Sequence, residues 1–172
     1  MKMNHLMTIN QIDLLEKLNY QNSNNILKLK KISTKISIKN NNIAELMFVS
    51  ELVTGTKPIL VKSKKHLAAF RLKKDKYVAA CATLRSNRLS DFLLNYLYFY
   101  YKNNFVKLMH NQVNRNVVNF SIVSIKSSPI VNEEVMLKVN NTYGSDISFV
   151  FNKQTTKSEI ILFLSAINIY IN

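Results

Sequence analysis

The sequence contains very few of the residues that build phosphate loops, disulfide frameworks and cysteine-rich metal sites. Among its 172 residues there are 2 glycines and 1 cysteine, and tryptophan is absent. The glycines, Gly55 and Gly144, lie far apart, which excludes nearly every glycine-based phosphate-binding loop. The lone Cys81 excludes an internal disulfide framework and a zinc site that uses several cysteines. Acidic residues are scarce too, since only 10 carboxylates accompany 24 lysines and arginines.

The basic excess gives a formal net charge of +14 and is concentrated in one part of the chain. Residues 28–88 hold 15 basic and 3 acidic groups, whereas the segments on either side are close to neutral. A generic solvated surface mixes the two signs more evenly. The charge therefore predicts a polyanionic partner, either nucleic acid or an anionic membrane surface, and its local concentration favours nucleic acid.

The sequence predicts neither a membrane span nor a targeting segment. Residues 1–10 carry one charge, Lys2, and no long apolar stretch, unlike a secretory signal or an arginine-rich import peptide. The longest apolar stretch, Leu89–Tyr101, is broken by Asp91 and Asn95 and is too short to span a bilayer. Asparagine, isoleucine, lysine, tyrosine and phenylalanine are abundant, and their codons are A/T-rich, as in a gene from an AT-biased genome such as an organelle's. We therefore expect a soluble protein that, if it works in an organelle, is made there.

Hydrophobic periodicity predicts an α+β fold in a single domain over residues 1–172. Apolar residues at three- and four-residue spacing predict helices, and alternating residues predict strands. The predicted helices are Thr8–Leu18, Ile43–Thr54, Leu89–Tyr100 and a last helix that opens with the capping-box pattern Thr156–Glu159. The predicted strands are Leu27–Ile38, Phe70–Leu72, Tyr77–Arg85, Val117–Ile125 and Asp146–Phe151. Because these strands are few and hairpin-like, they favour an antiparallel sheet with helices packed on one face and a basic free face.

Two strands have clearly different faces. In Leu27–Ile38, the apolar side carries Ile32, Thr34, Ile36 and Ile38, and the opposite side carries Lys31, Ser33, Lys35, Ser37 and Lys39. Lys28 and Lys30 are out of phase with this lysine row, which predicts a bulge or strand start near Lys30. In Tyr77–Arg85, one side carries Val78, Ala80, Ala82 and Leu84, and the other carries Tyr77, Ala79, Cys81, Thr83 and Arg85. The small residues on that strand leave room for a partner to approach closely.

Local signals predict where elements end and what they bury. The expected buried stripe of the helix Ile43–Thr54 is Ile43, Leu46, Met47 and Leu52, and Gly55 and Pro58 end the helix. We expect Phe70–Leu72 and Tyr77–Arg85 to form the arms of a hairpin with its tip at Lys73–Lys76. Ser86 or Asn87 is expected to cap the next helix, whose apolar positions are Leu89, Phe92, Leu93, Tyr96, Leu97 and Tyr100. Residues 102–116 are expected to be irregular.

No group of residues predicts catalysis, so we expect neither an enzyme nor a bound metal or cofactor. Glu133 and Glu134 are adjacent, so on a strand they would point to opposite faces. His66 lies in a lysine run, where it could touch phosphate or be a bystander, and His110 has no cysteine or carboxylate nearby. Cys81 has no base beside it in the sequence, which favours a packed thiol over a nucleophile.

Residues 51–94 carry an ordered set of short motifs. They are Thr54-Gly55-Thr56-Lys57-Pro58, the run with Lys62, Lys64 and Lys65, then Ala69-Phe70-Arg71, and Thr83-Leu84-Arg85 leading into a helix. In this order and spacing, the segment resembles the universal large-subunit ribosomal protein five family, the bacterial-type 5S rRNA-binding proteins, in a mitochondrial version. Weaker similarity towards both ends extends the resemblance over nearly the whole chain.

The resemblance implies a structural constituent of the large ribosomal subunit, placed in the central protuberance. It implies that the exposed sheet face binds 5S rRNA, large-subunit rRNA or both, and that the loop around Lys64–Arg71 approaches the peptidyl-site tRNA. Neighbouring large-subunit proteins and a protein of the small-subunit head would be further partners, without membrane contact. The implied RNA-binding residues are Lys31, Lys35, Thr56, Lys57, Lys62, Lys64, Lys65, Thr83, Arg85 and Arg88. The residues expected near tRNA are Phe70, Arg71, Lys73, Lys74 and Lys76.

The chain departs from the family pattern at three places. Lys35 stands where the family usually has asparagine, Thr56 where it often has glutamine, and Arg115–Ser121 where it has a glycine-rich loop. These changes exchange specific amide contacts for plain charge. The expected compartment is the mitochondrial matrix, with a plastid or bacterial source as the alternative. Other readings are a basic protein at a membrane surface, an RNA-binding protein outside the ribosome, and an RNA-modifying enzyme, for which no cofactor loop or catalytic cluster is visible.

Overall fold

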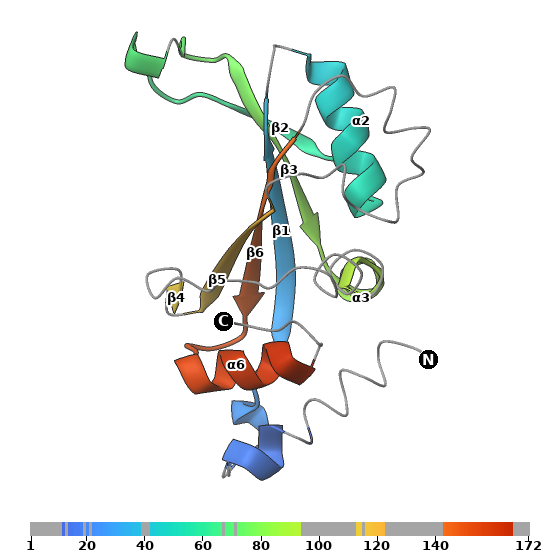
Figure 1. Cartoon of the computed structure of the whole chain (residues 1–172), viewed down its shortest axis with the longest axis vertical. Coiled ribbons are helices and arrows are strands. Elements are labelled where there is room, and N and C mark those ends of the chain that lie inside the picture. The colour runs from blue at the N-terminus through green and yellow to red at the C-terminus, as the bar shows by residue number, and fades with distance from the viewer. Residues whose placement is uncertain are drawn as a thin grey trace.

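The fold is an antiparallel sheet of six strands in the order β2-β3-β1-β6-β5-β4, with helices beside it (Figure 1). The computed structural model describes residues 12, 14–18, 20, 22–38, 42–66, 68–70, 72–93, 113–114, 116–122 and 143–166. The strands are β1 (Leu29–Ser37), β2 (Ile59–Lys62), β3 (Tyr77–Leu84), β4 (Val113–Asn114), β5 (Val117–Ile122) and β6 (Ser145–Phe151). The helices are α2 (Ile43–Thr54), α3 (Ser86–Phe92) and α6 (Lys157–Ala166), with 3-10 turns η1 (Ser23–Asn25) and η2 (Ala68–Phe70).

Strand β1 lies near the middle of the sheet and has the two faces that its sequence predicts. Ile32 and Ile36 are buried, whereas Lys35 is exposed. The pairing of β1 with β6 shifts register between Leu29 and Lys31, which confirms the predicted irregularity near Lys30. Because of this shift, Leu29 packs against the core although it has the same strand parity as Lys31.

The hydrophobic core lies between one face of the sheet and the helices. Buried side chains of β1, β3, β5 and β6 form one cluster with those of α3 and α6, in which the rings of Phe151 and Phe163 are 5.2 Å apart. A second cluster joins α2 to the same sheet face through Ile36, Leu46, Val49, Ala80 and Tyr143. The three helices therefore cover one face, and the predicted α+β architecture is confirmed.

Helix α2 has the predicted bounds but buries a different stripe. Asn42 accepts a hydrogen bond from the Glu45 N–H at 3.2 Å and so caps the N-terminus. At the other end Gly55 has a φ of 63°, the left-handed conformation that favours glycine. The buried residues are Leu46, Val49, Ser50 and Thr54. Of the predicted stripe, Leu46 is buried, Ile43 and Met47 are half-buried, and the prediction that Leu52 is buried was wrong. A helix that is apolar on nearly all sides gives no periodicity to identify its inner face.

Strand β3 pairs with β1 and β2, and the prediction that its hairpin partner is Phe70–Leu72 was wrong. Ala68–Phe70 forms η2 instead. Strand β2 takes the place beside β3 because it puts Leu60 against the cluster under α2. The chain leaves the sheet after Lys62 and returns at Tyr77, and Figure 1 shows this 63–76 loop extending beyond the end of the sheet.

Other boundaries differ from the prediction or lie outside the described residues. Arg85 is the N-cap residue of α3 and makes no side-chain cap hydrogen bond, so the prediction of Ser86 or Asn87 as cap was wrong. Val113–Asn114 pairs with β5, which places a short strand in the segment predicted to be irregular. Residues 14–18 are helical as predicted. The predictions also named residues that lie outside the described part of the chain, among them Thr8, Lys39, Arg71, Tyr96, Leu97, Tyr100, His110, Arg115, Ile125, Glu133 and Glu134.

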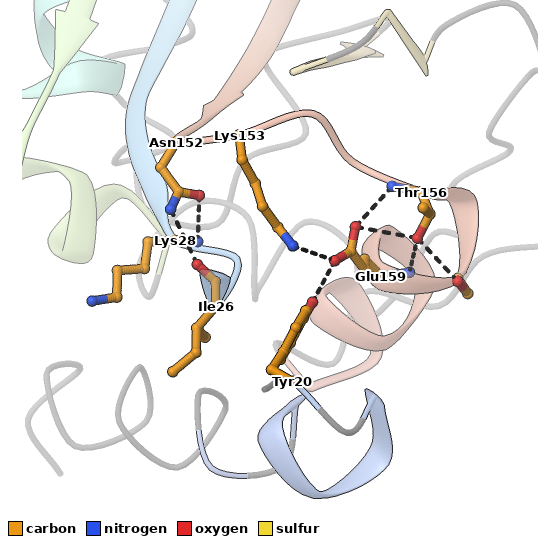
Figure 2. A network of polar contacts seen from close by, with 8 residues as sticks. Tyr20, Ile26, Lys28, Asn152, Lys153, Thr156 and Glu159 are labelled. Atoms are coloured by element: carbon orange, nitrogen blue, oxygen red, sulfur yellow. Dashed lines mark hydrogen bonds and ion pairs between the residues drawn. The ribbon is translucent and has the colours of Figure 1, made fainter. Parts of the chain in front are cut away.

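The capping box predicted at the start of α6 is confirmed and extends into a buried polar network (Figure 2). The Glu159 carboxylate accepts a hydrogen bond from the Thr156 N–H at 2.8 Å, and the Thr156 hydroxyl accepts one from the Glu159 N–H at 3.4 Å. Lys153 donates to the same carboxylate at 2.6 Å, and the Tyr20 hydroxyl donates to it as well. Burial by itself would raise the pKa of Glu159, but these donors outweigh it and lower the pKa to about 2.

This network joins the chain before β1 to the chain after β6. The Lys153 ammonium lies 4.4 Å from the centre of the Tyr20 ring, and burial and the Glu159 carboxylate raise the pKa of the Tyr20 phenol. Close by, the Asn152 amide donates to the Ile26 carbonyl at 3.1 Å and accepts from the Lys28 N–H at 2.9 Å (Figure 2). These contacts fix the start of β1 and the end of β6, which lie side by side in the sheet.

Candidate nucleic-acid interface

The face of the sheet opposite the helices, called the open face below, carries mostly small and polar side chains. Apolar residues lie towards its edges, where Val117 and Val150 pair beside Lys31 and the exposed Ile59 pairs with Cys81. The described residues of this face include Lys31, Ser33 and Lys35 of β1, Cys81 and Thr83 of β3, Asn119 and Ser121 of β5, and Asp146 and Ser148 of β6. These positions alternate with the buried ones along each strand, so the pleat alone sends them to this side. Most of them are exposed or half-buried.

A row of hydrogen-bonding side chains crosses the middle of the open face. Strand pairing puts Thr83, Ser33, Ser148 and Asn119 opposite one another in that order. The Cβ atoms of residues paired in this way lie about 5 Å apart. Three hydroxyls and one amide therefore form a continuous polar band on which a partner can approach the sheet closely.

Two lysines of β1 flank this row. Lys31 and Lys35 lie two residues to either side of Ser33, which puts their Cα atoms roughly 13 Å apart along the strand. Lys35 faces Cys81 on one neighbouring strand and Asp146 on the other. Asp146 accepts a hydrogen bond from the Ser121 hydroxyl at 3.0 Å. The middle of the open face is thus rich in hydroxyls, with a few separated charges. The sequence of β1 alone had predicted a row of amines.

The 63–76 loop carries a denser group of positive charges. Lys64, Lys65, Lys73, Lys74 and Lys76 are all exposed. The base of the loop is held by backbone hydrogen bonds, from Ser63 to Lys76 at 2.8 Å and from Asp75 to Ser63 at 3.0 Å. The predicted tip is confirmed as a turn, closed by a 3.3 Å bond from Lys76 to Lys73.

The side chains at the foot of this loop also contact each other. The Lys62 ammonium lies 5.2 Å from the centre of the Tyr77 ring, across the last pair of β2 and β3. Phe70 belongs to η2 by its backbone, and Arg71 lies outside the described residues.

The Thr54–Pro58 motif forms a corner between α2 and α3. The Thr54 hydroxyl donates to the Ser50 carbonyl at 2.7 Å and accepts from the Thr56 N–H at 3.3 Å. Thr56 also donates its own hydroxyl to that of Thr54 at 3.2 Å. The Arg88 guanidinium of α3 donates to the Gly55 carbonyl, and Pro58 is buried. Most of the motif therefore makes intramolecular contacts that fix the corner.

The residues predicted to bind RNA fall into three groups. Lys31, Lys35 and Thr83 lie together on the open face. Lys62, Lys64 and Lys65 lie at the foot of the 63–76 loop, near Lys73, Lys74 and Lys76 at its end. Thr56 and Arg88 lie at the α2–α3 corner, and Lys57 follows Thr56 in the chain. Arg85 follows β3 with an extended backbone and has the same strand parity as Thr83, so the pleat places it on the side of the open face, beyond Thr83.

Sequence reasoning missed the contribution of β5 and β6 to the open face. Asn119 and Ser148 complete the polar row, although neither was among the predicted site residues. The alternation of apolar and polar residues along β5 and β6 could have identified them. The apolar neighbours Phe120, Ile147 and Phe149 are buried, so the polar residues between them point to the other face. What the sequence does not contain is the strand order that brings β5 and β6 beside β1.

The described residues are arranged for binding, and they contain no group of three or more histidine, cysteine or acidic side chains that could hold a metal ion. Burial raises the pKa of the Cys81 thiol, and the nearby positive charge of Lys35 only partly offsets this, so the thiol stays protonated at neutral pH. His66 is exposed on the 63–76 loop. Of the helices that the structure describes, none has the length and apolar character needed to cross a bilayer.

The fold and these surfaces define an α+β binding protein with a hydroxyl-rich sheet face and a loop of exposed ammonium groups. Comparison with models of protein families gives no match. Comparison with individual proteins gives clear relatives. The large ribosomal subunit protein uL5 of Lactobacillus acidophilus is 33% identical over 83% of this chain and 82% of its own length. That of Lactobacillus helveticus is 32% identical over the same shares.

A mitochondrial relative matches along almost the entire chain. The large ribosomal subunit protein uL5m of Reclinomonas americana is 27% identical over 98% of this chain and 96% of its own length. The chain therefore belongs to the uL5 family of large ribosomal subunit proteins. The family, predicted from residues 51–94, is confirmed, as is the prediction of a structural protein and not an enzyme.

Proposed function

We propose that the chain is a structural constituent of the large subunit of a mitochondrial ribosome and that its open face binds rRNA in the central protuberance. The uL5 relatives support the ribosomal role. The observation that carries the RNA contact is the polar row of Thr83, Ser33 and Ser148 between Lys31 and Lys35. In this proposal residues 1–172 act as one domain.

The chemistry of this face suits the groove of a folded RNA. The shallow groove of an RNA helix displays 2′-hydroxyls and phosphates, and hydroxyl side chains can both donate to and accept from such groups. Lys31 and Lys35 would neutralise phosphates on either side of the groove. Such contacts read RNA shape, so both 5S rRNA and large-subunit rRNA fit, and the proposal includes either or both.

The 63–76 loop is proposed to approach the peptidyl-site tRNA. Its exposed lysines, at positions 64, 65, 73, 74 and 76, project beyond the sheet on a base that backbone hydrogen bonds hold in place. Phe70 and Arg71 belong to the same loop. A projecting group of like charges favours a polyanion that arrives from solution over one that is permanently packed against the sheet.

The α2–α3 corner is proposed to contact a further segment of rRNA through Lys57, which is exposed. Arg88 and Thr56 act there as positioning residues, because their polar groups already bond the corner together. Arg85, also exposed, would extend the RNA contact of the open face beyond Thr83.

Neighbouring large-subunit proteins and a protein of the small-subunit head complete the proposed partners. The relative uL5m and the abundance of residues that have A/T-rich codons support a mitochondrial, organelle-encoded protein.

The test introduces negative charge into the polar row. Thr83 is exposed, so Thr83→Glu leaves the core intact while it places a carboxylate against the proposed RNA backbone. Ser158→Glu, at the exposed start of α6 on the side of the helices, is the matched control. We expect Thr83→Glu to reduce co-sedimentation with the large subunit and to weaken rRNA binding at least about tenfold. The control should stay within about twofold of wild type.

Sequencing the RNA that crosslinks to the wild-type protein identifies the partner. A 5S-like RNA would support the 5S contact, and large-subunit rRNA alone would restrict the proposal to that RNA. Absence of rRNA, or equal sedimentation of Thr83→Glu and wild type, would show that the open face has been assigned wrongly. Flotation with anionic liposomes at physiological salt would then point to the membrane-surface alternative.

A further inference from the structure

Helix α2 has an outer face that is apolar although it points away from the core. Leu46 and Val49 pack against the sheet on the inner side. On the outer side Ala44, Phe48 and Leu52 follow one another at four-residue spacing, and Phe48 is 49% and Leu52 38% exposed. A helix that is apolar on nearly all sides is normally buried on nearly all sides. The outer face is therefore suited to contact another molecule.

The charge of α2 is opposite to that of the segment around it. Between residues 28 and 88, Glu45 and Glu51 are two of the three carboxylates, and α2 has no basic residue. Glu51 lies on the outer face next to Leu52 and is exposed. An RNA backbone would be repelled here, whereas a positively charged protein segment would be attracted.

We infer that the outer face of α2 is a docking surface for a basic, partly apolar segment of another protein, with Phe48 and Leu52 as apolar anchors and Glu51 as the charged contact. An aromatic side chain beside an aliphatic one and a carboxylate matches a partner helix or strand that carries apolar residues among lysines or arginines. This inference goes beyond the proposed RNA binding and does not depend on it, because α2 lies on the side of the sheet opposite the open face.

The surface is small, which fixes the kind of complex it can form. Three side chains on one helix bury far less than the roughly 1,200 Å² that a stable interface between two free proteins requires. The partner is therefore expected to be held close by other contacts, as neighbouring proteins are within a large assembly, while α2 determines which segment docks.

The first experiment places the photocrosslinking residue p-benzoylphenylalanine at position 48 of the full chain in the source cells. The same residue at position 161 is the control, because Ile161 is also an exposed apolar residue, 39% against 49% for Phe48, on a different helix. We expect position 48 to crosslink to a protein segment that combines net positive charge with apolar residues. Adding Glu51→Lys should lower that yield at least about fivefold and leave the yield at position 161 unchanged.

Several results would overturn the inference: a crosslink to RNA, to a second copy of the chain, or to an acidic segment, or a yield no higher than at position 161. Sedimentation of the chain with the large subunit is scored in the same samples. Loss of sedimentation would count against the proposed ribosomal role, whereas normal sedimentation without the expected crosslink would count against the docking surface alone.

The second experiment uses the purified full chain and two peptide probes of equal length, at millimolar peptide concentration because so small a surface binds a free peptide weakly. One is an amphipathic helix of leucine and lysine, and the other has glutamate in place of lysine. The chain as a whole has a net charge of +14, so general electrostatics disfavour the lysine peptide and favour the glutamate peptide. We expect the double variant Phe48→Gln/Leu52→Gln to bind the lysine peptide at least about fivefold more weakly than wild type, which would support the docking surface. Equal binding by the double variant and wild type would contradict it.

Discussion

Gly55 links Thr54 and Arg88 in the corner where α2 meets α3. Gly55 supplies the left-handed turn, Thr54 bonds the turn to the last turn of the helix, and Arg88 donates to the exposed Gly55 carbonyl. The geometry of the corner requires each of these residue types, so the motif has a role in folding that does not involve a partner. Its exposed member, Lys57, is the residue left to act outside the chain.

We predict that Gly55→Ala destabilises the protein by about 1–2 kcal/mol, because the φ of 63° places an L-residue in a strained conformation. A Cβ would lie 3.4 Å from the Arg88 guanidinium, an ordinary contact, so the backbone and not crowding causes the loss. Urea unfolding measures it. Gly55→Asn is the control and should lose less, because asparagine tolerates this conformation better. Equal stability of Gly55→Ala and wild type would refute the explanation.

Glu159→Gln tests the buried network, and we predict that it removes about 2 kcal/mol of stability at neutral pH. The pKa of Glu159 is lowered from 4.5 to about 2 in the folded protein. Its stabilisation is therefore complete above about pH 4.5 and is lost as the pH falls towards 2. The difference in unfolding free energy between wild type and variant should shrink over this range.

The control for Glu159→Gln is Glu51→Gln, because the Glu51 side chain is exposed. That variant should keep the acid dependence of wild type, because its carboxyl lies outside the network around Lys153 and Tyr20. A constant difference between wild type and Glu159→Gln from pH 5 down to pH 2 would contradict the assignment of the lowered pKa.

At the scale of elements, the 63–76 loop is separate from the core that supports β2 and β3. The bonds between Ser63 and Lys76 close its base, and the residues beyond them are exposed where their side chains are described, apart from the half-buried Leu72. The strands themselves are held by pairing between Ile59 and Cys81 and by Leu60 in the core. The loop can therefore carry a binding role without a role in stability.

We predict that replacing residues 64–75 with a two-residue Asn-Gly turn leaves the fold intact, with the midpoint of thermal unfolding within about 5 °C of wild type. Circular dichroism measures this midpoint. Binding of rRNA by the open face should be retained, while contact with peptidyl-site tRNA should be lost. The contrasting variant is Leu60→Asp in the chain with its loop intact. That change introduces a charge next to the core and should unfold the protein. Unfolding of the loop variant would show that the loop supports the sheet.

At the scale of the whole molecule, the two sides of the sheet differ in chemistry. The side of the helices holds the core, the corner and the acidic helix α2, and the open side holds hydroxyls with Lys31 and Lys35. A net charge of +14 gives any RNA a general attraction, but the polar row gives it a defined position. General and site-specific binding can be distinguished by their salt dependence.

We predict that Lys31→Gln/Lys35→Gln lowers the slope of log K against log salt for rRNA binding by about 1–2, one phosphate contact per lysine. Lys157→Gln, on the exposed start of α6, should leave the slope within about 0.3 of wild type because it lies on the other side of the molecule. Filter binding between 50 and 300 mM salt measures both. An equal effect of Lys157→Gln would indicate binding by net charge alone.

The sequence by itself determined the family, the α+β class, the faces of β1, the ends of α2 and the capping box of α6. These features depend on neighbouring residues: alternation defines a strand's faces, Asn42 and Gly55 define a helix's ends, and Thr156 with Glu159 forms a local hydrogen-bonded pair. Local interactions are encoded locally, so they can be predicted without the fold.

Only the tertiary structure decided which strands are neighbours, and with them the composition of the open face. The hairpin partner of β3, the burial of Val49 instead of Leu52, and the row that joins Thr83 to Asn119 all depend on contacts between distant segments. Helix α2 is apolar on most sides, so its sequence permits several orientations, and the sheet selects one of them. A face built from four strands exists only once those strands have been ordered, which no single segment of the sequence specifies.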